Sequence, residues 1–275
     1  MEKFNLLKRV EYNGNELRLY VSKDCYSFYD DCKYKYDEIR HNANNNIIIK
    51  NEKIIIKGPV ALSAGVIPFI TTRSSVKYLI LSLRSPHDYS SPLNLQFPAG
   101  HSSYGETAVE TAFREFGEEI ALWNMKKKKL ITFGLKTQKK YIESIWEERG
   151  FSDIKFYPVD SKNTKINFME FDGLLEYKMI KDRQVIDKGR VLAGYHKNKN
   201  SMELFFPVMV KVGSLQDIVP LYYEYGREVA FLYPYNLVDS IDPLYFSYSG
   251  KIVRTLLQLQ KNKYKKPTFI LLDVE

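Results

Sequence analysis

Residues 100–122 read GHSSYGETAVETAFREFGEEIAL and hold the most specific pattern in the chain. The stretch predicts a helix over residues 107–122, in which Glu115, Glu118 and Glu119 stand at i, i+3 and i+4 and project from one face. Carboxylates this close repel one another unless a cation offsets their charge. An all-oxygen set on a rigid element favours Mg²⁺ or Mn²⁺ over zinc. The pattern therefore predicts a metal site of the kind that handles phosphates.

The same residues resemble the signature of the Nudix hydrolases, a loop–helix–loop with one glycine, one separate glutamate and an Arg-Glu-aliphatic-x-Glu-Glu-x-Gly-aliphatic run. The positions that match in register are Gly100, Glu106, Arg114, Glu115, Phe116, Glu118, Glu119 and Leu122. Phe116 is aromatic where an aliphatic residue is usual, and Ala121 replaces the closing glycine. Glycine there permits a left-handed helix end that alanine adopts only with strain. We therefore expect a different helix exit and an intact site.

An acidic helix face is more often a solvated surface than a metal site. Such a face would not also require a glycine, a separate glutamate and an arginine at fixed distances, so the metal interpretation is favoured. By the resemblance, Glu115, Glu118 and Glu119 hold one or more Mg²⁺ ions, with the carbonyl of Gly100 as a further oxygen ligand.

The catalytic base and the supporting residues are assigned by the same resemblance. Glu106 and Arg114 are expected to form an ion pair that orients the loop and the helix. The base is either Glu115 or Glu119, or else a carboxylate outside the motif. The candidates outside the motif are Glu224, placed first, and Glu170, Glu176 and Glu203.

Substrate contacts are expected from residues that flank the motif. Arg84 follows an apolar run and is a candidate phosphate ligand. Phe97 and Tyr104 are candidates to stack on a base, although each residue type more often packs or lies on the surface.

Apolar runs around the motif predict the fold. Those at 60–70 and 78–83 predict a hairpin of two strands. Further strands are expected at 130–134, 204–212 and 229–233, helices at 141–149 and 249–261, a polar loop at 213–226 and insertion loops at 161–165 and 188–200. With the resemblance, this order implies an α/β class protein, an α/β/α sandwich with a mixed sheet.

Two regions are expected along the chain. Residues 58–275 would form the hydrolase domain, and residues 1–57 a β-rich N-terminal extension with strands at 16–21 and 47–56. In some Nudix enzymes such an extension builds a homodimer interface, and the same use is open to this chain.

Composition limits the remaining classes. The chain has 275 residues, 44% of them hydrophobic, and no apolar run long enough to span a bilayer. Its charged start is not typical of a signal peptide, so we expect a cytoplasmic protein. Cys25 and Cys32 are compatible with a disulfide, a metal pair or two buried thiols, and a reducing cytosol favours the thiols.

The net charge of +8 arises from 41 basic and 33 acidic residues. Because the motif is acidic, the positive excess lies elsewhere, notably in the runs 126–129, 136–140 and 261–266. Such runs attract polyphosphate and RNA without sequence preference. They are equally common as solvated faces, which is the interpretation we adopt.

These observations predict a Mg²⁺-dependent hydrolase of a nucleoside diphosphate linked to another moiety, a small-molecule nucleotide substrate. The spelling Pro98-Ala99-Gly100 and the extension favour an ADP-ribose or nucleotide-sugar pyrophosphatase. One alternative is an RNA 5′-cap or 5′-triphosphate pyrophosphohydrolase. Another is a non-catalytic nucleotide- or RNA-binding Nudix module, which would have no need for a repulsive glutamate cluster.

Overall fold

A computed structural model gives the fold of most of the chain. The described residues are 6–12, 17–22, 47–50, 53–56, 60–72, 77–86, 92–101, 106, 108–159, 178–180, 183–188, 191–196, 201–224, 229–247, 250, 253–254, 257 and 270–274. Tyr104, Glu170, Glu176, both cysteines and the basic run 261–266 lie outside them.

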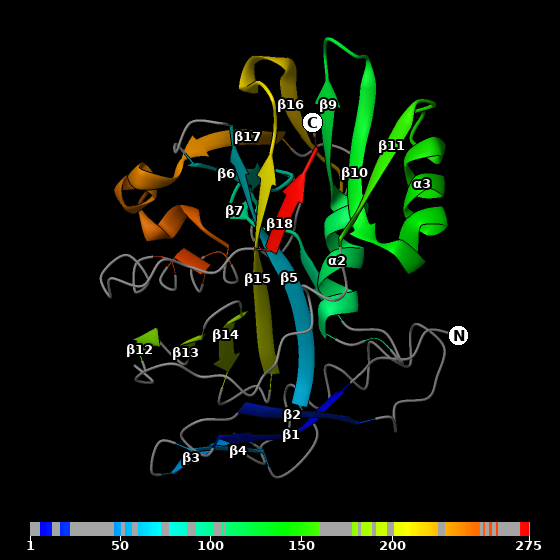
Figure 1. The fold of residues 1–275 in the computed structure, drawn as a ribbon. Coiled ribbons are helices and arrows are strands. Elements are labelled where there is room, and N and C mark those ends of the chain that lie inside the picture. Colours follow the sequence, from blue (N-terminus) through cyan, green and yellow to red (C-terminus); the bar gives the residue numbers. More distant parts are fainter. Residues whose placement is uncertain are drawn as a thin grey trace.

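A mixed sheet forms the centre of the molecule (Figure 1). Its two long strands, β5 (Val60–Thr71) and β15 (Ser201–Lys211), run parallel to each other. The strand β6 (Lys77–Leu83) pairs antiparallel with β5, which confirms the predicted hairpin. Four further strands complete this part of the sheet: β7 (Leu95–Gln96), β8 (Ala99–His101), β17 (Val229–Pro234) and β18 (Ile270–Asp273).

The N-terminal strands and a later meander extend the same sheet at the end of β5 that lies far from the helices (Figure 1). β1 (Leu6–Tyr12) pairs with β5 and with β2 (Leu17–Ser22). The meander comprises β12 (Lys178–Ile180), β13 (Arg183–Lys188) and β14 (Val191–His196), which pairs with β15. The predicted insertion loop at 188–200 is therefore wrong over β14.

The isoleucine-rich stretch 47–56 is not one strand as predicted. It forms a two-stranded hairpin, β3 (Ile47–Lys50) and β4 (Lys53–Ile56), in which Ile48 lies opposite Ile55. The sequence held a signal for this division, because the polar residues 50–53 separate two runs of three isoleucines.

A second, four-stranded sheet stands beside the first. Its order is β11 (Ile154–Val159), β10 (Lys129–Leu135), β9 (Ile120–Asn124) and β16 (Ile218–Tyr222). The predicted polar loop at 213–226 is wrong in its centre, where β16 pairs with β9.

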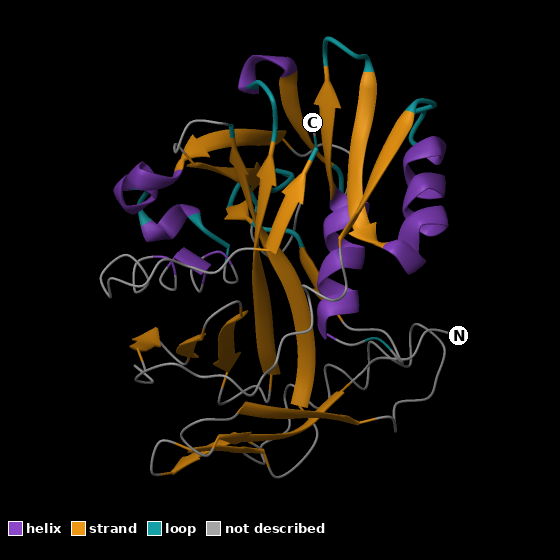
Figure 2. Cartoon of the chain, viewed as in Figure 1, coloured by secondary structure: helices purple, strands orange, loops and turns teal. Residues whose placement is uncertain are grey.

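Helix α2 (Ala108–Glu119) lies between the two sheets (Figure 2). Its buried side chains Phe113 and Phe116 join the core that both sheets line, and the Phe116 ring stacks on Phe133 of β10 at 5.2 Å. The helix predicted over 107–122 ends at Glu119, because Ile120 already begins β9. Burying this apolar face holds the helix in place.

Helix α3 (Lys139–Glu148) covers the outer face of the second sheet, where Ile142 and Trp146 pack against Ala121 and Leu130. It follows the short 3₁₀ turn η1 (Lys136–Gln138). The far face of the main sheet is covered by η4 (Tyr235–Ser240), η5 (Pro243–Tyr245) and helical positions in 250–257, while η3 (Leu215–Asp217) precedes β16.

The main sheet is therefore mixed and has helical elements on both faces, which confirms the α/β class. In the described part of the chain, no helix combines the length and the apolar character that crossing a membrane requires.

Candidate active site at the end of helix α2

Glu115 of α2 faces the backbone of Gly100 in β8. A Cβ atom built on Gly100 would overlap the Glu115 carboxylate, so any side chain there would displace it. Gly100 also pairs with Ala64 of β5, which fixes it in the main sheet. The glycine that opens the motif is therefore required by the close approach of the sheet to the helix.

Arg114, Glu106 and Glu118 form what we name the arginine end of the carboxylate cluster. Arg114 Nε donates to Glu106 Oε1 at 2.7 Å, and its Nη1 lies 3.2 Å from Glu118 Oε1. Nη1 also lies 2.7 Å from Glu115 Oε1, and Nη2 donates to the carbonyl of His101 at 3.0 Å. The expected ion pair between Glu106 and Arg114 is present. One guanidinium thus contacts three carboxylates.

The pKa values at this end reflect burial as well as pairing. Burial alone would lower the pKa of Arg114, but the charges of Glu115 and Glu106 outweigh it and the pKa is raised. Burial raises the pKa of Glu115 to about 7, helped by Glu118 and opposed by Arg114. Glu115 is therefore incompletely compensated even beside an arginine.

Glu119, Glu224, Tyr222 and Gln96 form the tyrosine end of the cluster. The Tyr222 hydroxyl lies 3.0 Å from Glu119 Oε2 and 3.1 Å from Glu224 Oε2. Gln96 Nε2 donates to the Tyr222 hydroxyl at 2.5 Å and to Glu224 Oε2 at 3.0 Å. Gln96 belongs to the main sheet, Tyr222 to the second sheet and Glu119 to α2, so this end lies where all three meet.

The Tyr222 hydroxyl and the Gln96 amide, both neutral groups, make the hydrogen bonds of the tyrosine end. Glu119 is only 6% exposed, and its pKa is raised well above the ordinary value by burial and by the charges of Glu115 and Glu224. Burial and the charges of Glu119 and Glu224 raise the pKa of the Tyr222 hydroxyl. Two carboxylates held together in a dry environment favour binding of a proton or a metal ion.

As arranged, no three His, Cys, Asp or Glu side chains within the described residues converge on one metal position. Glu118, expected as a metal ligand, instead faces Arg114. The donor chemistry still fits a hard divalent ion, because Glu115, Glu119 and Glu224 offer only oxygen ligands, and the charges of Glu115 and Glu224 add to burial in raising the pKa of Glu119.

The helix exit differs from the left-handed turn that the usual glycine permits. Ala121 lies in β9, is fully buried and pairs with Leu221 of β16. The last helical carbonyls are satisfied by tertiary donors: Trp146 Nε1 donates to Gly117 at 2.7 Å, Arg149 to Glu118, and the Tyr223 amide to Glu119 at 2.9 Å. No left-handed residue is needed.

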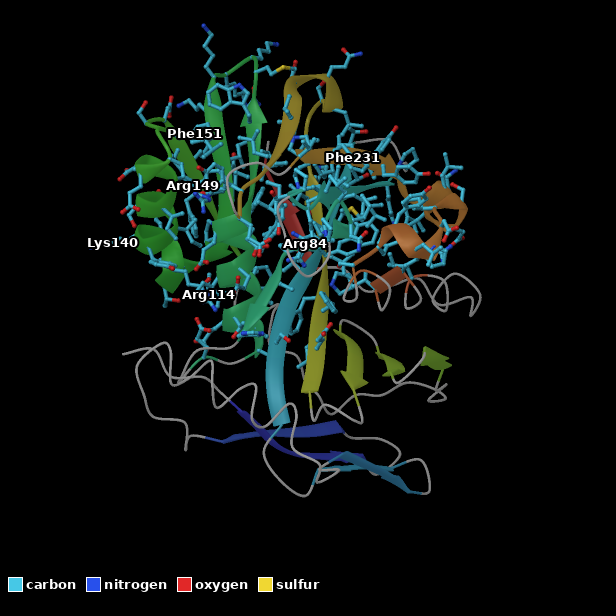
Figure 3. The ribbon with its side chains drawn as sticks, turned by 180° about the vertical axis from the view of Figure 1, so that it is seen from behind. Arg84, Arg114, Lys140, Arg149, Phe151 and Phe231 are labelled. Carbon is cyan, nitrogen blue, oxygen red and sulfur yellow. The ribbon has the colours of Figure 1, made fainter. Side chains whose placement is uncertain are left out.

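Arg149 holds this helix end from the side of α3 (Figure 3). Its guanidinium lies 4.7 Å from the centre of the Trp146 ring and 4.3 Å from that of Tyr223. A cation between two aromatic rings is favourably placed. Gly117 allows the close approach, because a Cβ there would overlap Ile142 of α3 and the Phe133 carbonyl.

The other predicted residues are spread over the main sheet. Arg84 follows β6, and continued alternation with Ser82 places it on the same face as Gln96, so it stays a candidate phosphate ligand. Phe97 is 3% exposed inside the core on the far side of the sheet, which gives it a packing role. Glu203 precedes Leu204 in β15, and Leu204 packs in the core on the α2 side of the sheet. Because neighbouring residues of a strand point to opposite faces, Glu203 lies on the face away from α2.

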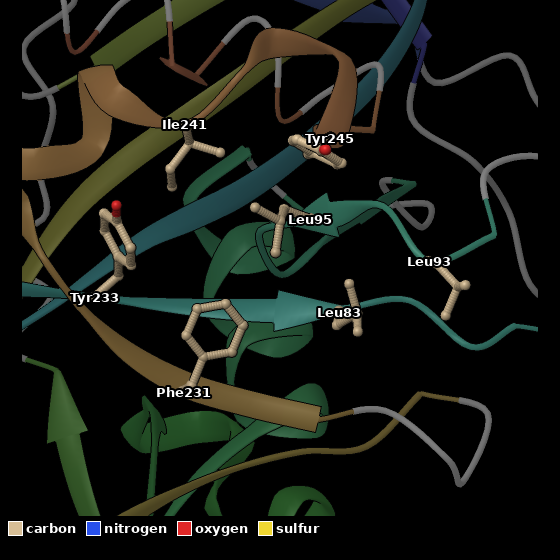
Figure 4. A pocket seen from close by; sticks show the side chains of 7 residues that line it. All are labelled: Leu83, Leu93, Leu95, Phe231, Tyr233, Ile241 and Tyr245. Carbon is tan, nitrogen blue, oxygen red and sulfur yellow. The ribbon is translucent and has the colours of Figure 1, made fainter.

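A cavity of about 260 Å³ lies on the opposite face of β7 from Gln96 (Figure 4). It is lined by Leu83, Leu93, Leu95, Phe231, Tyr233, Ile241 and Tyr245. Because Leu95 and Gln96 are adjacent in one strand, they point to opposite faces. The cavity is therefore separate from the carboxylate cluster.

Sequence reasoning missed Tyr222, Gln96, Trp146 and Arg149. For Tyr222 a signal exists, because residues 218–222 form an apolar run, Ile-Val-Pro-Leu-Tyr, of the length of a short strand. Glu224 lies two residues beyond Tyr222, which would place both on one face of an extended chain. For Trp146 and Arg149 the sequence holds no comparable signal, since their partners are backbone carbonyls.

Comparison with known proteins gives structural neighbours alone, since no protein-family model and no curated protein matches the sequence. A Nudix hydrolase from Alicyclobacillus acidocaldarius is 14% identical with a TM-score of 0.38, covering 77% of this chain and 97% of its own. One from Nitrosomonas europaea is 14% identical with a TM-score of 0.36, covering 80% and 81%. A MutT protein from Methanosarcina mazei Go1 is 13% identical with a TM-score of 0.36, covering 75% and 96%.

Proposed function

We propose that this protein is a Nudix-type pyrophosphohydrolase, which cleaves the diphosphate of a nucleoside diphosphate linked to another moiety with the help of Mg²⁺ or Mn²⁺. The observation that carries the proposal is the tyrosine end. Glu119 of the motif and Glu224, more than 100 residues later, meet at one buried hydroxyl. A solvated acidic helix face would not bury a carboxylate against a second one.

Three groups of this chain would hold the metal: the Glu115 and Glu119 carboxylates and the carbonyl of Gly100. When bound, the ion supplies charge neutralisation at the diphosphate and a lowered pKa for water. Glu118 is held by Arg114, so its proposed role is to keep Arg114 and Glu115 in place.

Glu224 is the proposed general base. Water attacks one phosphorus, the anhydride bond to its bridging oxygen breaks, and the proton of the water passes to the Glu224 carboxylate. Because Glu224 Oε2 is held by Gln96 and Tyr222, the carboxylate has a fixed orientation for this transfer. Arg84, on the Gln96 face of the main sheet, is proposed to contact a phosphate of the substrate.

An ADP-ribose or nucleotide-sugar substrate is favoured within this class. The exposed basic residues Lys126, Lys127 and Lys128 lie in the turn between β9 and β10, at the opposite end of β9 from Glu119. These lysines are the feature that favours RNA, so capped RNA is the second substrate to be tested. If capped RNA binds to them, kcat/KM on capped RNA should fall steeply as the salt concentration rises.

The decisive experiment is a substrate screen with Mg²⁺ that compares ADP-ribose, nucleotide sugars, dinucleoside polyphosphates and capped RNA. Products are separated and each bond that is cut is identified. We expect a nucleoside monophosphate from ADP-ribose or a nucleotide sugar, and no product in a chelator. Absence of cleavage of every diphosphate, with Mg²⁺ and with Mn²⁺, would overturn the proposal.

A further inference from the structure

We propose that Tyr222, together with Gln96, is a positioning residue that holds the metal ligand Glu119 and the base Glu224 at a fixed separation. This inference rests on the proposed function and adds two residues outside the motif to its machinery. Both are buried, at 5% exposure for Tyr222 and 6% for Gln96.

The hydrogen bonds form one connected unit. The Gln96 amide donates to both the Tyr222 hydroxyl and Glu224, and the hydroxyl in turn faces both Glu119 and Glu224. A hydroxyl has one proton, so Tyr222 donates to one carboxylate at a time while it accepts from Gln96. The unit therefore positions two negative groups without neutralising either of them.

Each member of the unit comes from a different element. Glu119 is the last residue of α2, Gln96 lies in β7 of the main sheet, and Tyr222 ends β16 of the second sheet. Gln96 is itself held through its backbone carbonyl, which accepts from Ser82 at 3.1 Å. The separation of the two carboxylates is thus set by both sheets.

A purely structural tyrosine would behave differently from a positioning one. Loss of a buried hydroxyl that only contributes to packing changes stability and leaves metal affinity alone. Loss of a group that orients a metal ligand weakens metal binding and lowers turnover, with effects of about 10- to 100-fold. Metal affinity therefore separates the two roles.

The test compares Tyr222→Phe and Gln96→Met with the control Tyr157→Phe, which removes a hydroxyl from β11 of the second sheet, outside the cluster. Binding of Mn²⁺ alone is titrated by the paramagnetic resonance of the free ion, and kcat and KM are measured on the substrate that the screen identifies. Circular dichroism establishes that each variant is folded.

We expect the Mn²⁺ dissociation constant of Tyr222→Phe to rise about tenfold or more and kcat to fall about 10- to 100-fold, with KM changed far less. Gln96→Met should show the same pattern. In the double variant, the fold-changes in Mn²⁺ affinity and kcat should be smaller than the product of the two single fold-changes. The control should match the wild type.

Wild-type Mn²⁺ affinity and kcat in folded Tyr222→Phe would overturn the inference and leave the proposed function standing. If Tyr222→Phe does not fold, wild-type behaviour of Gln96→Met would overturn it. A wild-type chain that neither binds Mn²⁺ nor cleaves any diphosphate would overturn the proposed function and this inference together.

Discussion

The two ends of the carboxylate cluster differ in how their charge is offset. At the arginine end, Arg114 contacts Glu106, Glu115 and Glu118 within 3.2 Å. At the tyrosine end, Glu119 and Glu224 share the neutral Tyr222 hydroxyl, and Glu224 also accepts from the neutral Gln96 amide. The first end has a cation in Arg114, whereas at the second end burial and the charges of Glu115 and Glu224 raise the pKa of Glu119, so that a cation bound there would stabilise it. The difference indicates where a metal would bind.

The largest expected effect comes from Glu119→Gln, set against Glu118→Gln one residue away. Glu119→Gln should lower kcat by at least about a hundredfold and stabilise the metal-free protein, because it removes a buried, uncompensated charge. Glu118→Gln should cost less activity, since Glu118 faces Arg114. Steady-state kinetics measure kcat of the two variants, and thermal unfolding in a chelator measures their stability without metal. Equal losses of kcat in the two variants would break the comparison between the ends.

Arg114→Ala tests the arginine end itself. Removing the guanidinium leaves three carboxylates uncompensated and should cost about 3 kcal/mol of stability together with most of the activity. Combined with Glu106→Ala, the loss should be smaller than the sum of the single losses. Arg114→Lys keeps the charge but loses the planar guanidinium, so its stability and activity should lie between those of the wild type and those of Arg114→Ala. Simple additivity in denaturant unfolding would show that Arg114 and Glu106 do not interact.

Stability of the metal-free protein should depend on pH through Glu115. Its pKa is about 7 in the folded state and 4.5 ordinarily, so the folded state holds the extra proton between these values. Stability is therefore greatest below about pH 4.5 for this group and falls as the pH rises towards 7, by about 1 kcal/mol per pH unit. Saturating Mg²⁺ should flatten the fall. A thermal-unfolding series from pH 5 to 8, with and without Mg²⁺, would contradict this if the two curves ran parallel.

The smallest effect concerns the helix exit beside the tyrosine end. Ala121→Gly restores the usual motif residue, yet it should destabilise by about 1 kcal/mol, because Ala121 is an extended, buried strand residue. Lys128→Gly is the matched control, since Lys128 has a φ of 50° in an exposed turn and glycine relaxes it. Chemical denaturation should show a lower free energy of unfolding for Ala121→Gly and a higher one for Lys128→Gly. Stabilisation by Ala121→Gly would show that the exit is strained.

The local part of the site was predictable from sequence, and the part made by distant segments was not. The spacing of Glu115, Glu118 and Glu119 and the pairing of Glu106 with Arg114 follow from helix periodicity and motif. The division of the glutamates between two ends does not, because it depends on Tyr222, which contacts Glu119 from the second sheet, and on Gln96, which contacts Tyr222 and Glu224 from the main sheet.

The fold shows the same limit. Long apolar runs predicted β5, β6, β15 and β17 well, because these strands are rich in β-branched and aromatic residues. β16 was read as loop because it contains Pro220 and polar residues flank it, although its pairing with β9 makes it a strand. The helix boundary at Glu119 is also set by that pairing, which local propensity does not report.

The junction between Glu119 and Ile120 has no spacer, since the last helical residue is followed directly by the first residue of β9. A helix turns about 100° per residue and a strand alternates every residue, so one inserted or deleted amino acid here would rotate the carboxylates away and exchange the two faces of β9. The number of residues between Arg114 and Leu122 is therefore fixed to the single residue, if the carboxylates are to keep their partners and β9 its buried face.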